Sequence, residues 1–164
     1  MRKLSIATLV LLGVSTIAQA EDALFQIKSL TPETALIAAR TAMETCRKQG
    51  FQVSVAVVDR SGLTQVLLRD RFAGAHTIDI ATNKAWTAAS FHTNTSTLST
   101  DTQPGKPLSG LRGLDRFMGV GGGVVIEGAG SYYGGIAVSG APGGDSDEQC
   151  AKAGLSAIAD ALEF

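Results

Sequence analysis

The side chains best suited to chemistry in this sequence are two histidines, His76 and His92, and two cysteines, Cys46 and Cys150. Two histidines are too few for an ordinary His-rich metal site, and the cysteines match neither the CxxC nor the CxxCH spacing. The sequence has no GxGxxG that opens a helix, no P-loop, and no GxSxG, HExxH or EF-hand motif. A Ser-His-Asp triad stays open, although no local pattern favours one. These absences argue against nucleotide-binding and conventional hydrolase functions.

The two cysteines fall on two expected helices, Cys46 near the end of the first helix and Cys150 near the start of the last. If those helices lie antiparallel on one face of a sheet, the two positions come together. In an oxidising compartment a disulfide is the natural alternative to two buried thiols, so both states stay open. Counting free thiols in the unreduced, denatured protein distinguishes them.

The elements that must position these side chains follow from the periodicity of the chain. Thr31 and Pro32 form a typical helix start, and Asp145 lies three residues before Glu148 in an acidic variant of the capping box. Residues 93–119 show no sustained period and predict a long loop. The expected elements are a short strand over 24–29, a helix over 31–48, strands 51–58 and 63–68 in one hairpin, a helix over 75–91, strands 124–127 and 132–139 in a second hairpin, and a helix over 145–162. This order predicts one α+β domain, an antiparallel sheet of about five strands with three helices on its faces.

The first twenty residues predict a cleaved signal peptide. Residues 1–3 are positively charged, residues 4–14 are an apolar run too short to span a bilayer comfortably, and Ala18-Gln19-Ala20 is a small-residue cleavage site. A membrane anchor is the competing interpretation, but no apolar run of spanning length follows. We therefore expect residues 1–20 to be removed on export and residues 21–164 to form one domain, periplasmic or secreted, without a membrane span.

The charge distribution argues against a nucleic-acid partner. The chain has 14 Lys and Arg against 15 Asp and Glu, and only 5% of its residues are aromatic. Because the basic residues are scattered along the sequence, they form no basic stripe with interleaved aromatic side chains.

Several motifs, in the same order from about Thr31 to Leu162, resemble the GlcG/HbpS family. They are RDRFAGA at 69–75, ATNKAWTAASF at 81–91, GGG at 121–123, GGIAVSG at 134–140 and DEQCA at 147–151. The sequence departs from the family pattern in two places. Phe72 and Ala73 replace the usual Met and Asp, and Val124-Val125 replaces the common Pro-Ile.

The resemblance implies a profilin-like α/β/α fold, assembly as a homo-oligomer and, for several members, binding of haem, here haem b. The family is related to the C-terminal domain of PduO-type adenosyltransferases and has also been called haem-degrading. We expect an exported protein that binds haem or a related tetrapyrrole reversibly in haem or iron handling. Two alternatives stay open: a haem-degrading or other small-molecule enzyme with a site between subunits, and a ligand-free extracytoplasmic accessory to a sensor or transporter. No catalytic residue is assigned.

The histidines and three basic residues are the candidate haem contacts. Imidazole is a standard axial ligand of haem iron, so His92 is the first candidate for the iron and His76 the second. On one straight helix, residues 76 and 92 would lie about 24 Å apart and could not bind the same iron from one protomer. Arg69, Arg71 and Lys84 would pair with the haem propionates. A surface position for His76, a helix-dipole role for His92 and an ion pair for Lys84 are the competing interpretations.

Overall fold

The structure is a computed structural model, and it describes residues 24–163. The expected signal peptide over residues 1–20 lies outside the described residues. Four strands form one antiparallel sheet in the order β2-β1-β4-β3. Their bounds are Ser54–Asp59 for β1, Thr64–Arg69 for β2, Gly123–Gly128 for β3 and Ser131–Ser139 for β4. The four α-helices are α1 (Pro32–Lys48), α2 (Thr77–Phe91), α3 (Thr95–Asp101) and α4 (Gly144–Ser156).

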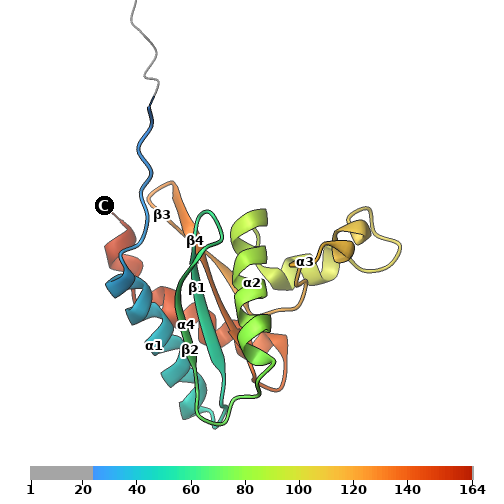
Figure 1. Ribbon diagram of the computed structural model, residues 1–164, viewed down its shortest axis with the longest axis horizontal. Helices are drawn as coiled ribbons and strands as arrows, with labels where there is room; N and C mark the ends of the chain where they lie inside the picture. The colour runs from blue at the N-terminus through green and yellow to red at the C-terminus, as the bar shows by residue number, and fades with distance from the viewer. Residues whose placement is uncertain (1–23, 164) are drawn as a thin grey trace, which may run out of the picture.

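Helices cover both faces of the sheet, which confirms the expected α+β, α/β/α arrangement. Helices α1 and α4 lie side by side on one face, and α2 lies on the other (Figure 1). Alternate residues of the central strand β1 therefore enter two cores, and five of its six residues are buried. Val55 and Val57 pack with α1 and α4, whereas Ala56 and Val58 pack against the alanines of α2. The small alanine side chains allow α2 to approach the sheet closely.

Helix α1 begins as its sequence predicts. The Thr31 hydroxyl accepts a hydrogen bond from the Thr34 N–H at 3.2 Å, and Pro32 occupies the first turn. A disulfide joins Cys46 of α1 to Cys150 of α4, with 5.6 Å between the two Cα atoms. This bond ties the two helices of one face together across a sequence separation of 104 residues.

The expected strand over residues 24–29 was wrong. These residues are extended but make no strand pairing, and the side chains of Leu24, Phe25 and Ile27 are exposed. In Figure 1 this segment runs away from the layers instead of along an edge of the sheet. The sheet consequently has four strands in the described chain, because apolar alternation alone supplies no hydrogen-bonding neighbour.

The structure also corrects two boundaries of helices. Helix α4 begins at Gly144, without a side-chain cap, and ends at Ser156, with a 3-10 turn over Ala159–Leu162. Asp145 is exposed in its first turn, while Asp147 is buried and bonds elsewhere, so the expected capping box does not form.

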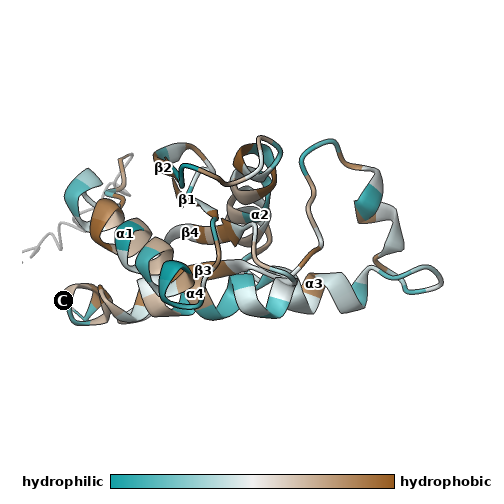
Figure 2. Cartoon of the chain, turned by 90° about the horizontal axis from the view of Figure 1, so that it is seen from below, coloured by the Kyte–Doolittle hydropathy of each residue, from teal (hydrophilic) through white to brown (hydrophobic). Residues whose placement is uncertain are grey.

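Residues expected to form only a loop contain α3, whose buried Thr95 and Leu98 pack inward. The rest of that segment, residues 103–116, forms an arm that projects from the layers in Figures 1 and 2.

Candidate functional site

The last residue of β2 and the connection from β2 to α2 carry three of the five candidate haem contacts, and a buried carboxylate holds the connection in place. Asp70 is 2% exposed and accepts two hydrogen bonds from Arg47, from Nε at 2.6 Å and from Nη2 at 2.9 Å. Its Oδ1 also accepts the Arg71 N–H, and its own N–H bonds to Val53 O. The connection therefore leaves the sheet along a path fixed by both side-chain and backbone bonds of Asp70.

The neighbours of Asp70 point the other way, into solvent. We call the surface formed by Arg69, Arg71, Phe72 and His76 the basic corner. All four side chains are exposed, and Phe72 has 79% of its area accessible. An Arg69 Nη2 group donates a hydrogen bond to the Ala73 carbonyl, which orders the guanidinium along the connection. The exposed phenyl ring of Phe72 offers an apolar wall to a ligand held by the arginines and the imidazole.

His76 lies immediately before α2, at a start that is fixed from inside. The buried Thr77 hydroxyl bonds to the Gly74 carbonyl at 2.6 Å and to the Ser54 hydroxyl of β1 at 2.7 Å. The His76 ring lies over Gly74, where a Cβ atom would come within 2.5 Å of the imidazole Cε1. Glycine at this position therefore leaves room for the ring, and the helix start holds it at the surface.

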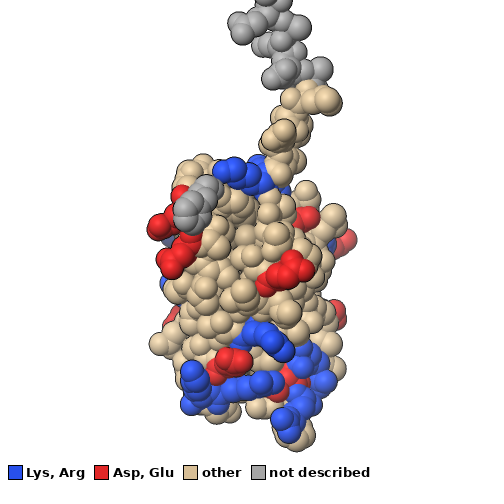
Figure 3. All heavy atoms as spheres, turned by 90° about the vertical axis from the view of Figure 1, so that its left-hand side faces the viewer, with Lys and Arg blue, Asp and Glu red and all other residues tan. Residues whose placement is uncertain are grey.

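The electrostatics of the basic corner suit an anion. The hydrogen bonds from Arg47 hold the pKa of the Asp70 carboxyl below its ordinary value, so Asp70 is ionised and balances Arg47. Arg69 and Arg71 have no ion-pair partner within residues 24–163. Figure 3 shows Lys and Arg atoms gathered at the lower end of the molecule, where β2 leaves the sheet. Net positive charge therefore remains around His76.

The other histidine lies at the opposite end of α2, and we call its surroundings the hairpin end: His92, Glu127 and Tyr132. His92 ends the helix in the left-handed conformation, with φ of 49°, and its backbone N–H bonds to Ala88 O. Its ring stacks on Tyr132 with 4.0 Å between ring centroids. The Tyr132 hydroxyl donates to Ala89 O at 2.5 Å, and burial raises the pKa of Tyr132 to about 12. His92 is thus a helix cap with one ring face already covered.

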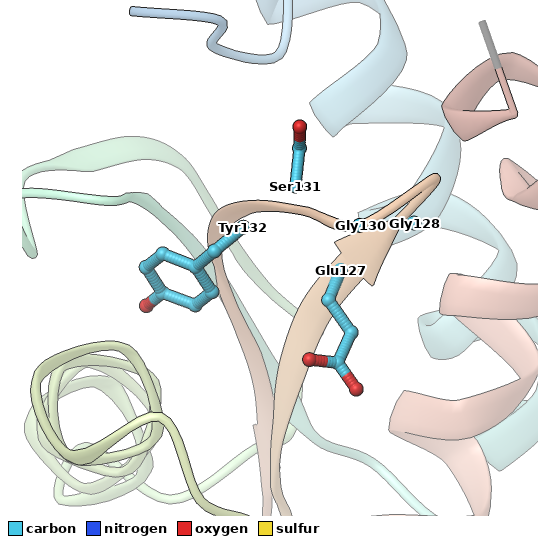
Figure 4. A pocket seen from close by; sticks show the side chains of 5 residues that line it. All are labelled: Glu127, Gly128, Gly130, Ser131 and Tyr132. Carbon is cyan, nitrogen blue, oxygen red and sulfur yellow. The ribbon is translucent and has the colours of Figure 1, made fainter.

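A shallow hollow of about 380 Å³ lies at this end, on the tip of the β3–β4 hairpin. Figure 4 shows Tyr132 and Glu127 extending in different directions from the two strands of the hairpin and Ser131 pointing away from both. Tyr132 and Glu127 are cross-strand partners at the tip of this hairpin. Charges of both signs act at this end, Arg60 against Asp59 and Glu127, so it lacks the excess positive charge of the basic corner.

Lys84 lies at the centre of the fold, in a buried ion pair. Its side chain is 2% exposed, and Nζ donates to Asp147 Oδ2 at 2.8 Å and to Val138 O at 3.1 Å. Burial raises the pKa of the Asp147 carboxyl, against the opposing attraction of Lys84. A Cβ on Gly122, whose φ is 122°, would come within 2.8 Å of Lys84 Nζ. The structure therefore gives Lys84 the ion pair that the sequence left open as its alternative role, and the propionate contact of Lys84 stays an untested prediction.

The structure separates the remaining candidates into two groups. His76, Arg69 and Arg71 lie together in the basic corner, whereas His92 is one unbroken helix of 15 residues away. A single iron cannot bind both histidines of one chain. Sequence reasoning noticed Phe72 only as a departure from the family pattern and did not assign Glu127 a role. The position of Phe72 between two arginines and a histidine could have identified it.

Haem needs an accessible axial side chain, an apolar wall and cations for its two propionates. The basic corner offers His76 as the axial side chain and Phe72 as the apolar wall. Its two arginines supply the cations, so its residues fit the group. The hairpin end offers a histidine whose ring is partly covered by Tyr132, so it fits less well. Within residues 24–163 no group of three or more His, Cys, Asp or Glu side chains could hold a bare metal ion. No helix in that range is long and apolar enough to cross a membrane.

Comparisons with known proteins identify the family of the chain and agree with its fold. Residues 30–156 match the family model described as haem degrading protein HbpS-like. A crystal structure of a double mutant of HbpS from Streptomyces reticuli superposes with a TM-score of 0.79 at 39% identity, over 89% of this chain and 98% of that chain. A crystal structure of a PduOC complex with haem superposes with a TM-score of 0.76 at 30% identity, over 80% and 96% of the two chains.

The chain is also similar to a curated relative of different length. Corrinoid adenosyltransferase PduO of Salmonella typhimurium is 32% identical over 121 residues, which are 73% of this chain and 36% of the relative. The chain therefore spans about a third of the length of that relative.

Proposed function

The chain belongs to the HbpS-like family, and from this premise we propose that it is an exported protein that binds haem reversibly through His76 of the basic corner. Haem iron would supply the site with an electrophilic centre for one axial imidazole. Arg69 and Arg71 would bind the propionates, and Phe72 would shield one side of the ring system from water. The solved complex of a relative with haem supports the choice of ligand.

One observation supports this proposal most directly: the grouping of His76, Phe72 and two arginines on a connection that Asp70 holds rigid. Preorganisation matters because the protein spends little binding free energy on ordering the loop. The surface is also open, which suits a ligand that binds and leaves.

Export is supported by the disulfide and by the signal-like first twenty residues. A disulfide between Cys46 and Cys150 persists in the periplasm or outside the cell and is rare in the reducing cytosol. We therefore place the protein in the periplasm or the secreted fraction. Fractionation of cells with an antibody against residues 21–164 tests this localisation, and a cytosolic product of full length would contradict it.

A haem titration followed at the Soret band tests the function, with His92→Ala as the matched control for His76→Ala. We expect a defined Soret shift with the wild-type protein, at least about tenfold weaker binding by His76→Ala, and binding within about twofold of wild type by His92→Ala. Absence of a defined shift with the wild type would refute haem binding. The reverse order of the two variants would place the haem at the hairpin end.

Self-association would cover the open haem site of the basic corner. We propose that a second copy of the chain binds the arm over residues 103–116. Leu108 and Leu114 are 46% and 48% exposed on an arm that projects from the layers in Figures 1 and 2. At its base, Arg116 lies over the Trp86 ring of α2 and its carbonyl accepts from Thr87. Light scattering should report an oligomer for wild type and a smaller species for Leu108→Ser/Leu114→Ser. A wild-type monomer would contradict the assembly.

The family description also raises haem breakdown as a second function. We favour binding without turnover because both oxygens of Asp70, the buried carboxylate of the corner, already accept hydrogen bonds. Incubation of the haem complex with a reductant distinguishes the two functions. A stable Soret band supports binding alone, and release of iron with a discrete tetrapyrrole product would establish an enzyme.

A further inference from the structure

A second basic hollow lies between α1 and the edge strand β2, and Arg69 is one of its lining residues. It has a volume of about 420 Å³ and is lined by Arg40, Met43, Glu44, Arg47, Leu68 and Arg69. Met43 and Leu68 form an apolar floor, and both belong to the core beneath α1. The hollow therefore combines a hydrocarbon surface with three guanidinium groups.

The chain builds this hollow from two regular elements. Arg40 and Arg47 are two turns apart on α1, so they lie on the same side of the helix with Met43 between them. Leu68 pairs with Val55 in the sheet and shares its face, which is the face that α1 covers. Because β2 is an edge strand, the hollow opens to solvent beside it. Its position does not depend on a loop.

The three arginines differ in how many of their donor groups already bond within the protein. Arg47 gives Nε and Nη2 to Asp70, which neutralises it. Arg69 gives one Nη2 bond to a backbone carbonyl, which adds no negative charge. Arg40 makes no ion pair and no hydrogen bond from its side chain within the described residues. Glu44 is the one carboxylate on the lining, so the hollow keeps excess positive charge.

We propose that this hollow binds a small organic carboxylate, with its carboxylate on Arg40 and Arg69 and its hydrocarbon part on Met43 and Leu68. A guanidinium pairs with a carboxylate through two parallel hydrogen bonds and is more weakly hydrated than an ammonium. The apolar floor favours a ligand with several methylene or aromatic carbons over inorganic phosphate. A free carboxylic acid and a propionate arm of haem share this chemistry. The free-acid site does not rest on the haem proposal.

Nuclear magnetic resonance with hexanoate as the probe tests the site on residues 21–164 with the disulfide intact. We expect saturable shifts of the Met43 methyl and Leu68 methyl signals, with a Kd of about 1 mM or below. The neutral isostere hexanamide should leave these signals unchanged. Arg40→Gln should weaken hexanoate binding about tenfold, whereas Arg60→Gln, an exposed arginine at the far end of the sheet, should not. Equal shifts with hexanamide, no saturation, or an unaffected Arg40→Gln would overturn the proposal.

Competition with haem then identifies the source of the carboxylate. If haem displaces hexanoate and haem dimethyl ester does not, the natural occupant is a propionate arm. If haem binds without displacing hexanoate, the occupant is a free acid. Failure of haem to bind at all would remove the proposed function and leave the hexanoate result intact.

Discussion

The basic corner and the hairpin end each present one histidine at an end of α2, but they surround it with different chemistry. His76 stands free at the surface beside an exposed phenyl ring and two arginines without ion-pair partners. His92 caps the helix and stacks on Tyr132, whose cross-strand partner is Glu127. An imidazole that could ligate iron is therefore not enough to make a haem site. The residues around the imidazole decide whether an anionic porphyrin can approach it.

One aspartate orders the backbone near each of the two regions, Asp70 at the basic corner and Asp59 near the hairpin end, and Asp70 makes the more extensive contacts. Asp70 is buried and accepts hydrogen bonds from Arg47 and from the backbone of Arg71. Asp59 closes the β1–β2 turn by accepting from the Ser61 and Leu63 N–H groups at 2.8 and 3.0 Å. Only Asp70 bonds to a helix, α1, on the sheet face opposite α2. The basic corner is consequently tied to α1, and through the disulfide to α4.

The largest effect should come from removing the disulfide, because Cys46 precedes Arg47 in α1. The double variant Cys46→Ala/Cys150→Ala should lose about 4 kcal/mol of unfolding free energy, since the bond closes a long loop. Hydrogen exchange should increase more over residues 69–76 than over residues 128–132. Equal increases at the two ends would break the link between the disulfide and the basic corner.

Asp70→Asn should lower the Tm by about 5 °C, and Asp59→Asn should lower it less. Asp70 has a lowered pKa in the folded protein, so its contribution is complete above its unfolded pKa of about 3.9 and is lost as pH falls. Between about pH 5 and about pH 3, wild type should therefore lose stability more steeply than Asp70→Asn. Asp147, whose pKa burial raises, acts with the opposite sign in both proteins and cancels in the comparison. Parallel pH profiles would contradict the role of Asp70.

Charge reversal tests whether electrostatics distinguish the two ends. Arg71→Glu should weaken haem binding about tenfold at low salt, and the difference should shrink at high salt because the charges are exposed. Arg60→Glu, on the turn near Tyr132, should bind like wild type at every salt concentration. Equal effects of the two substitutions would show that only net charge matters.

The smallest effect is expected at the hairpin end. Tyr132→Phe removes the hydrogen bond to Ala89 O and should cost about 1 kcal/mol of unfolding free energy. In an absorbance titration of the phenols, the component near pH 12 should disappear from this variant. Haem affinity should remain within about twofold of wild type. A larger loss of affinity would assign Tyr132 to the binding site.

The layer architecture was predictable because it depends on patterns that are local in sequence. Strand alternation, the turn at residues 59–62 and the cap at Thr31 each specify one element, and the short connections leave an antiparallel sheet. Helix α3 was not predictable in this way. Its sequence, TSTLSTD, has weak helix propensity, and the helix forms because Thr95 and Leu98 are buried against the body.

The candidate site was predictable by residue type but not by grouping. Spacing along α2 already placed His76 and His92 too far apart for one iron. Whether Lys84 faced solvent or a carboxylate depended on Asp147, which is 63 residues away in sequence. The exposure of Phe72 depended on Asp70 turning inward to Arg47. The Lys84–Asp147 and Arg47–Asp70 contacts both join residues far apart in sequence. Such pairs leave no hydrophobic periodicity from which one sequence could predict them.

The most direct measurement is the paramagnetic effect of ferric haem on the backbone amide signals of the folded protein. Binding at the basic corner should broaden the signals of residues 71–78 first and leave those of His92 and Tyr132 sharp. Broadening of His92, Glu127 and Tyr132 with residues 71–78 unaffected would contradict the assignment of haem to His76.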